Sequence, residues 1–158
     1  MDTYTGTLMN GYQFLEQIGV GGFAIVYRAV QPALGRDVAI KIILPAYANH
    51  PDFVRRFEQE ARLIARLEHP HIVPLYDYWQ DENGAFLVMR WLPKTLRAKL
   101  QEAPFSLADA ARVLDQIASA LHTAHRSGII HRDIKPDNLL LDVEGNVYLA
   151  NFGIAKAE

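Results

Sequence analysis

The chain contains no cysteine among its 158 residues. It therefore has no disulfide framework, no thiolate nucleophile and no Cys-based zinc site, which fits a reducing compartment. Long apolar runs are missing too, since none approaches the roughly 18 residues that a membrane-spanning helix needs. Residues 1–10 also lack the charged and apolar regions of a secretory signal. We therefore expect a cytoplasmic protein with no membrane segment.

A strong charge of either sign is absent as well. The formal net charge is -2 and the isoelectric point is about 6.3, so no basic field is available to attract nucleic acid. We do not expect a nucleic-acid partner. Half of the residues are hydrophobic and 22% are charged, which is typical of a globular domain with a sizeable core.

Hydrophobic periodicity predicts a sheet with one helix in the first half of the chain. Strands are predicted at residues 12–18, 23–29, 37–43, 72–80 and 85–89. The last two flank the turn Asp81-Glu82-Asn83-Gly84, where glycine suits a positive φ. A helix is predicted from Pro51 to about Leu67, with an apolar stripe that also contains Glu60. The expected arrangement is a five-stranded antiparallel sheet plus one helix.

The second half is predicted to be mainly helical. A helix should begin after Ser106, which starts a sequence like a capping box, and end near Gly128. The predicted buried face of this helix consists of apolar residues at helical spacing, namely Ala110, Val113, Leu114, Ile117, Leu121 and Ala124. Short apolar strands are expected at 129–130, 139–141 and 147–149. The fold class is therefore α+β.

A glycine-rich turn lies between the first two predicted strands, with the sequence Gly19-Val20-Gly21-Gly22-Phe23-Ala24. Small residues let backbone N–H groups approach phosphate oxygens closely. The alternative is an ordinary glycine-rich hairpin. Dinucleotide binding is disfavoured because that motif leads into a helix, and a mononucleotide P-loop would need a following GK[ST].

A lysine interrupts the third predicted strand in the sequence Val38-Ala39-Ile40-Lys41. A buried ammonium needs an anionic partner, and Glu60 on the apolar stripe of the next helix has the matching need. The pair could clamp nucleotide phosphates beside the glycine-rich turn. The alternative is that Lys41 extends to solvent and Glu60 lies at the edge of the stripe.

The most informative motif is His131-Arg132-Asp133-Ile134-Lys135-Pro136-Asp137-Asn138. In it, Asp133 could orient a hydroxyl and accept its proton, and Lys135 could neutralise a transferred phosphoryl group. Asn138 offers an amide oxygen of the kind that Mg²⁺ prefers. A solvated turn of charged residues is the alternative for any one of them, but it does not account for the whole spacing. Phosphoryl transfer requires these three chemistries together.

Together these motifs resemble the eukaryotic-like protein kinase family, in the style of bacterial serine/threonine kinases, from about Gly11 to the end of the chain. The resemblance implies a polar leader at 1–10, a complete kinase N-lobe at 11–89, a hinge at 90–93 and the first part of the helical C-lobe at 94–158. It implies ATP with Mg²⁺ or Mn²⁺ as cofactors, and a protein substrate or regulatory protein as partner. The Lys135 context implies serine/threonine specificity.

The resemblance also assigns the site residues. Catalytic roles fall on Lys41, Glu60, Asp133 and Lys135, and metal binding on Asn138 and Asn151. Nucleotide contacts fall on Ile18, Gly19, Val20, Gly21, Gly22, Phe23, Ala24, Val26, Ala39, Lys41, the gatekeeper Met89, Arg90, Leu92 and Leu140. A regulatory hydrophobic column would contain Ile64, Leu75, His131 and Phe152.

The chain departs from the family pattern at Asn151-Phe152-Gly153, where the family has DFG. A neutral amide cannot supply the carboxylate's charge, so we expect weaker metal binding and transfer slower by on the order of a thousandfold. The sequence ends at Glu158, so we also expect a C-lobe truncated before the activation segment. The core against which Val113, Ile117 and Leu121 should pack would then be incomplete, and a partner would cover the exposed apolar patch. The alternatives are a pseudokinase-like module that binds nucleotide or protein, and a fragment without function.

Overall fold

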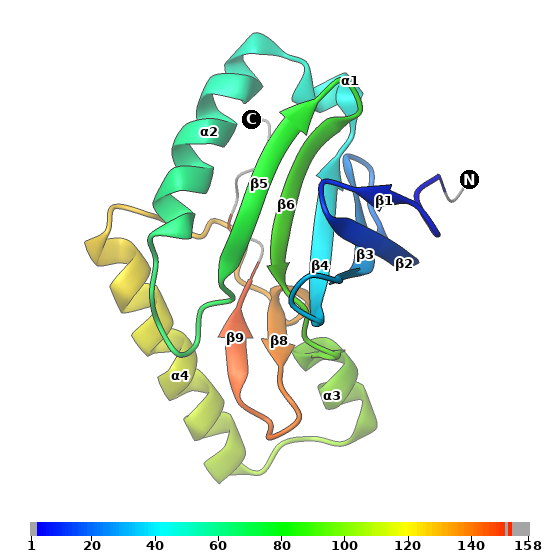
Figure 1. The fold of residues 1–158 in the computed structure, drawn as a ribbon. Helices are drawn as coiled ribbons and strands as arrows, with labels where there is room; N and C mark the ends of the chain where they lie inside the picture. The colour runs from blue at the N-terminus through cyan, green and yellow to red at the C-terminus, as the bar shows by residue number, and fades with distance from the viewer. Residues whose placement is uncertain (1–2, 151, 153–158) are drawn as a thin grey trace. The chain divides into compact units, whose positions relative to one another are not determined.

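The computed structural model describes residues 3–150 and Phe152. The chain forms two compact units (Figure 1). Among the described residues, unit 1 contains 3–61 and Leu75–Trp91, and unit 2 contains Arg62–Pro74, 92–150 and Phe152.

Unit 1 is built on a six-stranded antiparallel sheet with the order β1-β2-β3-β4-β6-β5. Its strands are β1 (Leu8–Met9), β2 (Tyr12–Val20), β3 (Ala24–Gln31), β4 (Arg36–Ile43), β5 (Leu75–Asp81) and β6 (Gly84–Arg90). Five of these were predicted from the sequence. The sixth is β1, which pairs with β2 and lies within the segment predicted to be a polar leader. Strand pairing uses the main chain, so a polar segment without apolar alternation can still join the sheet.

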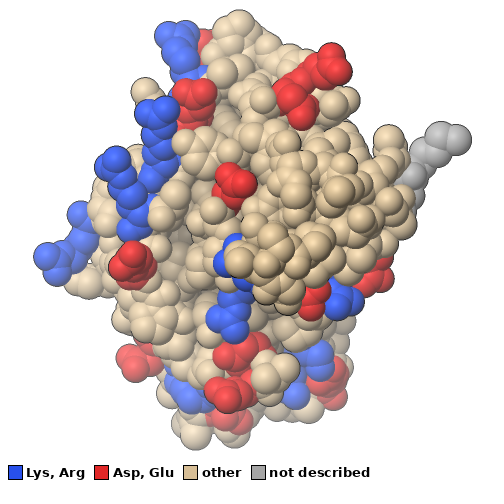
Figure 2. Space-filling model, viewed as in Figure 1, with Lys and Arg blue, Asp and Glu red and all other residues tan. Residues whose placement is uncertain are grey.

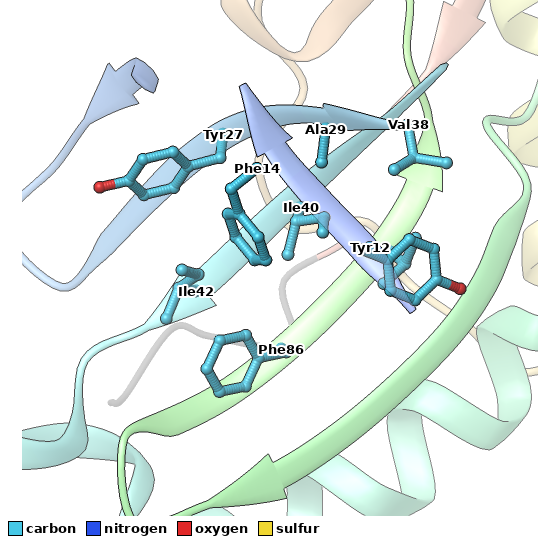
Figure 3. Close-up of a cluster of buried hydrophobic side chains, with 9 residues drawn as sticks. Tyr12, Phe14, Tyr27, Ala29, Val38, Ile40, Ile42 and Phe86 are labelled. Atoms are coloured by element: carbon cyan, nitrogen blue, oxygen red, sulfur yellow. The ribbon is translucent and has the colours of Figure 1, made fainter. Parts of the chain in front are cut away.

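One face of this sheet carries the core of unit 1. Large buried side chains from β2, β3, β4 and β6 interdigitate there (Figure 3), namely Tyr12, Phe14, Tyr27, Ile40, Ile42 and Phe86. Near the N-terminus, the Tyr4 ring lies 5.6 Å from the Phe14 ring and 5.7 Å from the Tyr27 ring. Removal of this apolar surface from water is the main stabilising contribution.

The opposite face of the sheet packs against α2 (Pro51–Ala65), which follows the short helix α1 (Pro45–Ala48). Phe57 on α2 lies 6.0 Å from Tyr78 on β5, between ring centroids. Tyr78 is paired with Leu87, one residue along from Phe86 of the core face, so it points to the other side of the sheet. The predicted apolar stripe of α2 is confirmed, because Phe53, Phe57, Ile64 and Leu67 are all buried.

Unit 2 combines helices with a small three-stranded sheet of order β7-β8-β9. Its elements are β7 (Lys94–Thr95), α3 (Leu96–Glu102), α4 (Leu107–Arg126), the 3-10 helix η1 (Pro136–Asn138), β8 (Leu139–Leu141) and β9 (Val147–Leu149). The predicted helix start is confirmed, since the Asp109 N–H donates to Ser106 Oγ at 3.1 Å. At the other end Gly128 adopts a φ of +76°, as expected of a glycine that closes a helix.

Two strand predictions were wrong. Residues 129–130 form no strand, because the Ile129 N–H instead donates to the Ala124 carbonyl at the end of α4. The strand predicted to begin at residue 72 begins at Leu75, because Ile72 pairs with Leu149 of β9. In both places the backbone bonds to a partner that apolar patterning does not reveal.

The predicted buried face of α4 is confirmed at Val113 and Ile117, so the apolar exposure expected near them from a truncated C-lobe does not occur. Both side chains are buried, at 5% and 9% exposed, because the β8–β9 hairpin covers this face of α4. The Val147 N–H donates to Gln116 Oε1 at 3.0 Å, and Arg112 Nη1 donates to the Gly145 carbonyl at 3.1 Å. The prediction was wrong at Leu114, which is 66% exposed, because the hairpin covers the side of α4 that carries Val113 and Ile117.

The surface carries charges of both signs. On the face drawn in Figure 2, Lys and Arg are interspersed with Asp and Glu, and several basic side chains gather over α2, which exposes Arg55, Arg56 and Arg62. In the part of the chain that the structure describes, no helix has the length and apolar character that a bilayer crossing requires.

Candidate functional site

The predicted nucleotide contacts on β3, β4 and β6 share one face of the unit 1 sheet. Directly paired residues of antiparallel strands lie on the same side. Val26 pairs with Lys41, and Lys41 pairs with Leu87. Ala39 pairs with Met89 in the same register, and alternate residues of a strand share a face. Val26, Ala39, Lys41 and Met89 therefore lie together on the face that packs against α2.

The glycine-rich turn connects β2 to β3 and is closed by a hydrogen bond from the Gly21 N–H to the Ala24 carbonyl at 2.8 Å. Glycine is not required there by the turn itself. None of Gly19, Gly21 and Gly22 has a positive φ, and a methyl group added at Gly21 would come no closer than 3.5 Å to the rest of the described structure. The missing side chains instead leave the main chain accessible to a ligand.

Lys41 lies beside this turn, with Nζ 5.5 Å from the centroid of the Phe23 ring. The lysine is half-buried. Glu60 is half-buried on α2, next to the buried Ala61, and α2 lies on the same face of the sheet as Lys41. The two residues therefore share the face that the predicted ion pair requires. The ion pair itself stays a prediction.

In unit 2, the catalytic-loop motif is organised around the buried side chain of His131, which is 1% exposed. Its Nδ1 accepts a hydrogen bond from the Asp133 N–H at 3.1 Å. The ring proton is therefore on Nε2, which donates to the Ala150 carbonyl. The His131 and Phe152 ring centroids are 4.8 Å apart, so these two members of the predicted hydrophobic column are neighbours.

Three predicted residues of the motif meet at the Asp133 carboxylate. Asn138 Nδ2 donates to Asp133 Oδ2 at 2.9 Å and to the Asp133 carbonyl at 2.8 Å. Lys135 Nζ lies 3.7 Å from the same Oδ2. Arg132, immediately before Asp133, has a φ of +68°, a left-handed conformation that costs energy for a residue other than glycine. The loop is thus held in a specific, locally strained conformation.

The conformation of Asn138 is compatible with one of the two metal contacts predicted from the sequence. Its amide nitrogen is directed to Asp133, so the amide oxygen is the atom with the chemistry of a metal ligand. Asn151, the other predicted ligand, lies outside the described residues. Across residues 3–150 and Phe152, no group of three His, Asp or Glu side chains is arranged to hold a metal. The two predicted metal ligands, Asn138 and Asn151, are neutral amides, which bind a divalent cation more weakly than carboxylates do.

The remaining predicted nucleotide contacts are divided between the units. Ile18, Val20 and Arg90 belong to unit 1, where Ile18 and Val20 are exposed and Arg90 is half-buried. Leu92 and Leu140 belong to unit 2, where Leu92 is buried and Leu140 half-buried. The structure thus separates the predicted site into a sheet face with a glycine-rich turn and a loop that carries the polar chemistry.

Comparison with known proteins identifies this combination, because a family model described as the protein kinase domain matches residues 12–158. The chain belongs to the protein kinase domain family. Its fold is the α+β protein kinase fold, with the N-lobe sheet, its helices and part of the C-lobe.

Relatives of this kinase domain include bacterial serine/threonine kinases. It is 43% identical over 148 residues to serine/threonine-protein kinase PrkC of Bacillus subtilis, a match that covers 92% of the chain and 23% of that protein. It is 41% identical over 154 residues to PknD of Mycobacterium tuberculosis, covering 96% and 23%. The chain thus spans about a quarter of the length of these curated relatives.

The crystal structure of a cysteine-to-alanine mutant of the Mycobacterium tuberculosis PknI kinase domain is similar to this structure, with a TM-score of 0.83 and 29% sequence identity. The alignment covers 99% of this chain and 64% of that one.

The sequence motif did not predict that the His131 ring makes hydrogen bonds to both Asp133 and Ala150. The motif assigned it only to the hydrophobic column. No local signal reveals the bond to Ala150, because the acceptor lies 19 residues further along the chain.

Proposed function

We propose that this chain is a serine/threonine protein kinase domain that binds ATP with Mg²⁺ or Mn²⁺, and that Asn151 strongly impairs its transfer of the γ-phosphoryl group to protein hydroxyls. The observation that carries the proposal is the convergence of Asn138 and Lys135 on the Asp133 carboxylate. This arrangement supplies a base, a cation and a metal ligand in one loop.

In this proposal Asp133 orients the substrate hydroxyl and accepts its proton, while Asn138 fixes the carboxylate's direction. Lys135, close to the same carboxylate, would stabilise charge on the transferred phosphoryl group. A divalent cation, when bound, supplies neutralisation of phosphate charge. Asn138 and Asn151 would hold it.

ATP binding is supported by the arrangement of unit 1. The glycine-rich turn offers main-chain N–H groups to the phosphates, and Lys41, oriented by Glu60, would bind them from the strand. Val26 and Ala39 provide an apolar surface for the adenine ring. Met89 would act as gatekeeper, and the residues from Arg90 to Leu92 would form the hinge that contacts the base.

A kinase assay tests the transfer step. Radiolabelled ATP, Mg²⁺ or Mn²⁺ and a generic protein substrate are compared for the unaltered chain, Asn151→Asp and Asp133→Ala. We expect Asn151→Asp to exceed the unaltered chain by about a thousandfold and Asp133→Ala to stay at background. Equal rates for the unaltered chain and Asn151→Asp would contradict the impairment.

The second candidate function is a pseudokinase-like module that binds ATP without transferring phosphate, and Asn151 favours it. A binding assay distinguishes this module from an active kinase domain. We expect ATP with metal to raise the thermal unfolding temperature of the unaltered chain, because a ligand that binds only the folded state stabilises it. If ATP raises the unfolding temperature but even Asn151→Asp transfers no phosphate in the kinase assay, the binding module is favoured. The absence of any shift, with or without metal, would contradict nucleotide binding.

A further inference from the structure

A stacked arginine and tryptophan lie where unit 1 joins the predicted hinge. The Arg28 guanidinium is 4.5 Å from the centroid of the Trp91 ring, within the range of a cation–π interaction. Trp91 directly follows the last residue of β6 and is the last residue of Leu75–Trp91 in unit 1. The contact therefore connects the middle of β3 to the point at which the chain leaves the sheet.

Arg28 is held in place from two neighbouring strands. Its Nη1 lies 3.4 Å from Glu16 Oε1, and its Nη2 lies 3.4 Å from Asp37 Oδ2. Glu16 is its direct partner on β2, and Asp37 lies on β4. Its Nε is buried and makes no hydrogen bond with the described residues, so the two terminal nitrogens and the stacked ring fix the side chain. The two carboxylates hold the guanidinium group over the Trp91 ring.

Arg28 also lies on the face that carries the predicted nucleotide contacts. It pairs with Ala39, and Ala39 pairs with Met89. None of the motifs used to recognise the site includes Arg28 or Trp91. Trp91 nevertheless lies within the stretch from Met89 to Leu92, whose main chain would contact the base, and Arg28 contacts that stretch through the Trp91 ring.

We propose that Arg28 is a positioning residue for the base of the nucleotide: its stack on Trp91 fixes the main chain that follows β6 in the conformation that contacts adenine. The inference rests on the proposed nucleotide binding. It assigns to Arg28 an effect on ligands that contain adenine, and no effect on the binding of phosphate groups at the glycine-rich turn.

Two tryptophans in the chain make the stack directly observable. Trp79 is partly buried and packs against the core of unit 1, stacked on Phe86 at 4.6 Å between centroids, so Trp79→Phe leaves Trp91 as the single reporter. In that background we expect Arg28→Ala to shift the emission of Trp91 and to increase its quenching by acrylamide, with Arg28→Lys intermediate. Unchanged emission and quenching in Arg28→Ala would overturn the stack.

Binding is then measured by calorimetry with adenosine and, separately, with inorganic tripolyphosphate. We expect Arg28→Ala to weaken adenosine binding about fivefold, the effect of losing one partly exposed cation–π contact, and to leave tripolyphosphate binding unchanged. Equal weakening for both ligands would mean a general disturbance of the sheet and would overturn the positioning role. Unchanged adenosine affinity would overturn it too.

Arg36→Ala is the matched control. Arg36, on β4 of the same sheet, lies 3.7 Å above the Tyr76 ring and pairs with Gln31 at the end of the β3–β4 ladder. We expect its loss to leave adenosine affinity unchanged, and weakening equal to that of Arg28→Ala would overturn the assignment. If the unaltered chain bound neither adenosine nor ATP, the proposed function and this inference would both fail. Failure of Arg28→Ala alone would concern only the inference.

Discussion

At the scale of single residues, the catalytic loop is held by hydrogen bonds more than by charge. Asn138 is 6% exposed and makes two hydrogen bonds to Asp133. Lys135 is 49% exposed and lies 3.7 Å from the Asp133 carboxylate, a geometry in which solvent screens most of the attraction. The position of Asp133 should therefore depend on Asn138, and Lys135 should matter for the chemistry.

This difference predicts unequal effects on stability. We expect Asn138→Ala to lower the free energy of unfolding by about 1–3 kcal/mol, because two hydrogen bonds of a buried amide are lost. We expect the neighbouring change Lys135→Ala to lower it by less than about 1 kcal/mol. Urea denaturation of both variants measures the difference. Equal losses would show that the ion pair holds the loop as firmly as the amide does.

At the scale of elements, the connection from α2 to β5 is tied to α4 and β9 by two histidines. His69 Nδ1 accepts from the His71 N–H at 3.0 Å, so its proton is on Nε2, which lies 2.9 Å from Ser119 Oγ on α4. His71 Nδ1 lies 3.0 Å from the Val147 carbonyl on β9 and donates to it. Burial, and then the neighbouring His71, lower the pKa of His69. The folded chain therefore favours the neutral ring.

A lowered pKa makes this connection sensitive to acid. Between the lowered pKa and the unfolded value of about 6.5, the unfolded chain binds more protons than the folded chain. We therefore expect the stabilisation from neutral His69 to be complete above about pH 6.5 and to be lost as the pH falls through the lowered pKa. Urea midpoints measured from about pH 7.5 to 5.5 should fall for the unaltered chain.

The His69→Gln variant should show a smaller fall, because its side chain does not titrate. His122→Gln, at an exposed position on α4, is the control and should keep the slope of the unaltered chain. Identical slopes for all three proteins would exclude His69 as the source of the pH dependence.

At the scale of the whole molecule, each unit has buried apolar residues of its own. Unit 1 buries one face of its sheet, and unit 2 buries the side of α4 against the β8–β9 hairpin. Unit 2 also leaves several apolar side chains exposed, among them Leu107 at 88%, Leu114 at 66% and Ile130 at 66%. Exposed apolar residues of this kind favour self-association.

Two leucine-sized residues on α4 therefore give opposite predictions. Leu114→Ser removes an exposed side chain and should leave the free energy of unfolding within about 0.5 kcal/mol while it reduces aggregation. Ile117→Ser alters a side chain that is 9% exposed and should cost about 2–5 kcal/mol. Denaturation and light scattering measure both effects. A large loss of stability in Leu114→Ser would show that its face is covered in solution.

Much of the fold could be predicted because it follows from local chemistry. The stripe on α2, the Ser106 cap and the β5–β6 turn each depend on a few adjacent residues. Gly84 shows this most clearly, since the turn that it ends gives it a φ of +135°, a conformation that favours glycine. The ordered motifs likewise predicted the family, and the structure brings Asp133, Lys135 and Asn138 together.

The sequence by itself determined the fold family and the chemical inventory, because side-chain type and spacing encode periodicity, caps and motif order. Tertiary structure alone decided the pairing of β1, the face of α4 that the β8–β9 hairpin covers, the hydrogen bond from His131 to Ala150 and the contact of Arg28 with Trp91. Each of these depends on main-chain hydrogen bonds or on contacts between distant segments. The local sequence pattern does not indicate such partners, because they become neighbours only when the chain has folded.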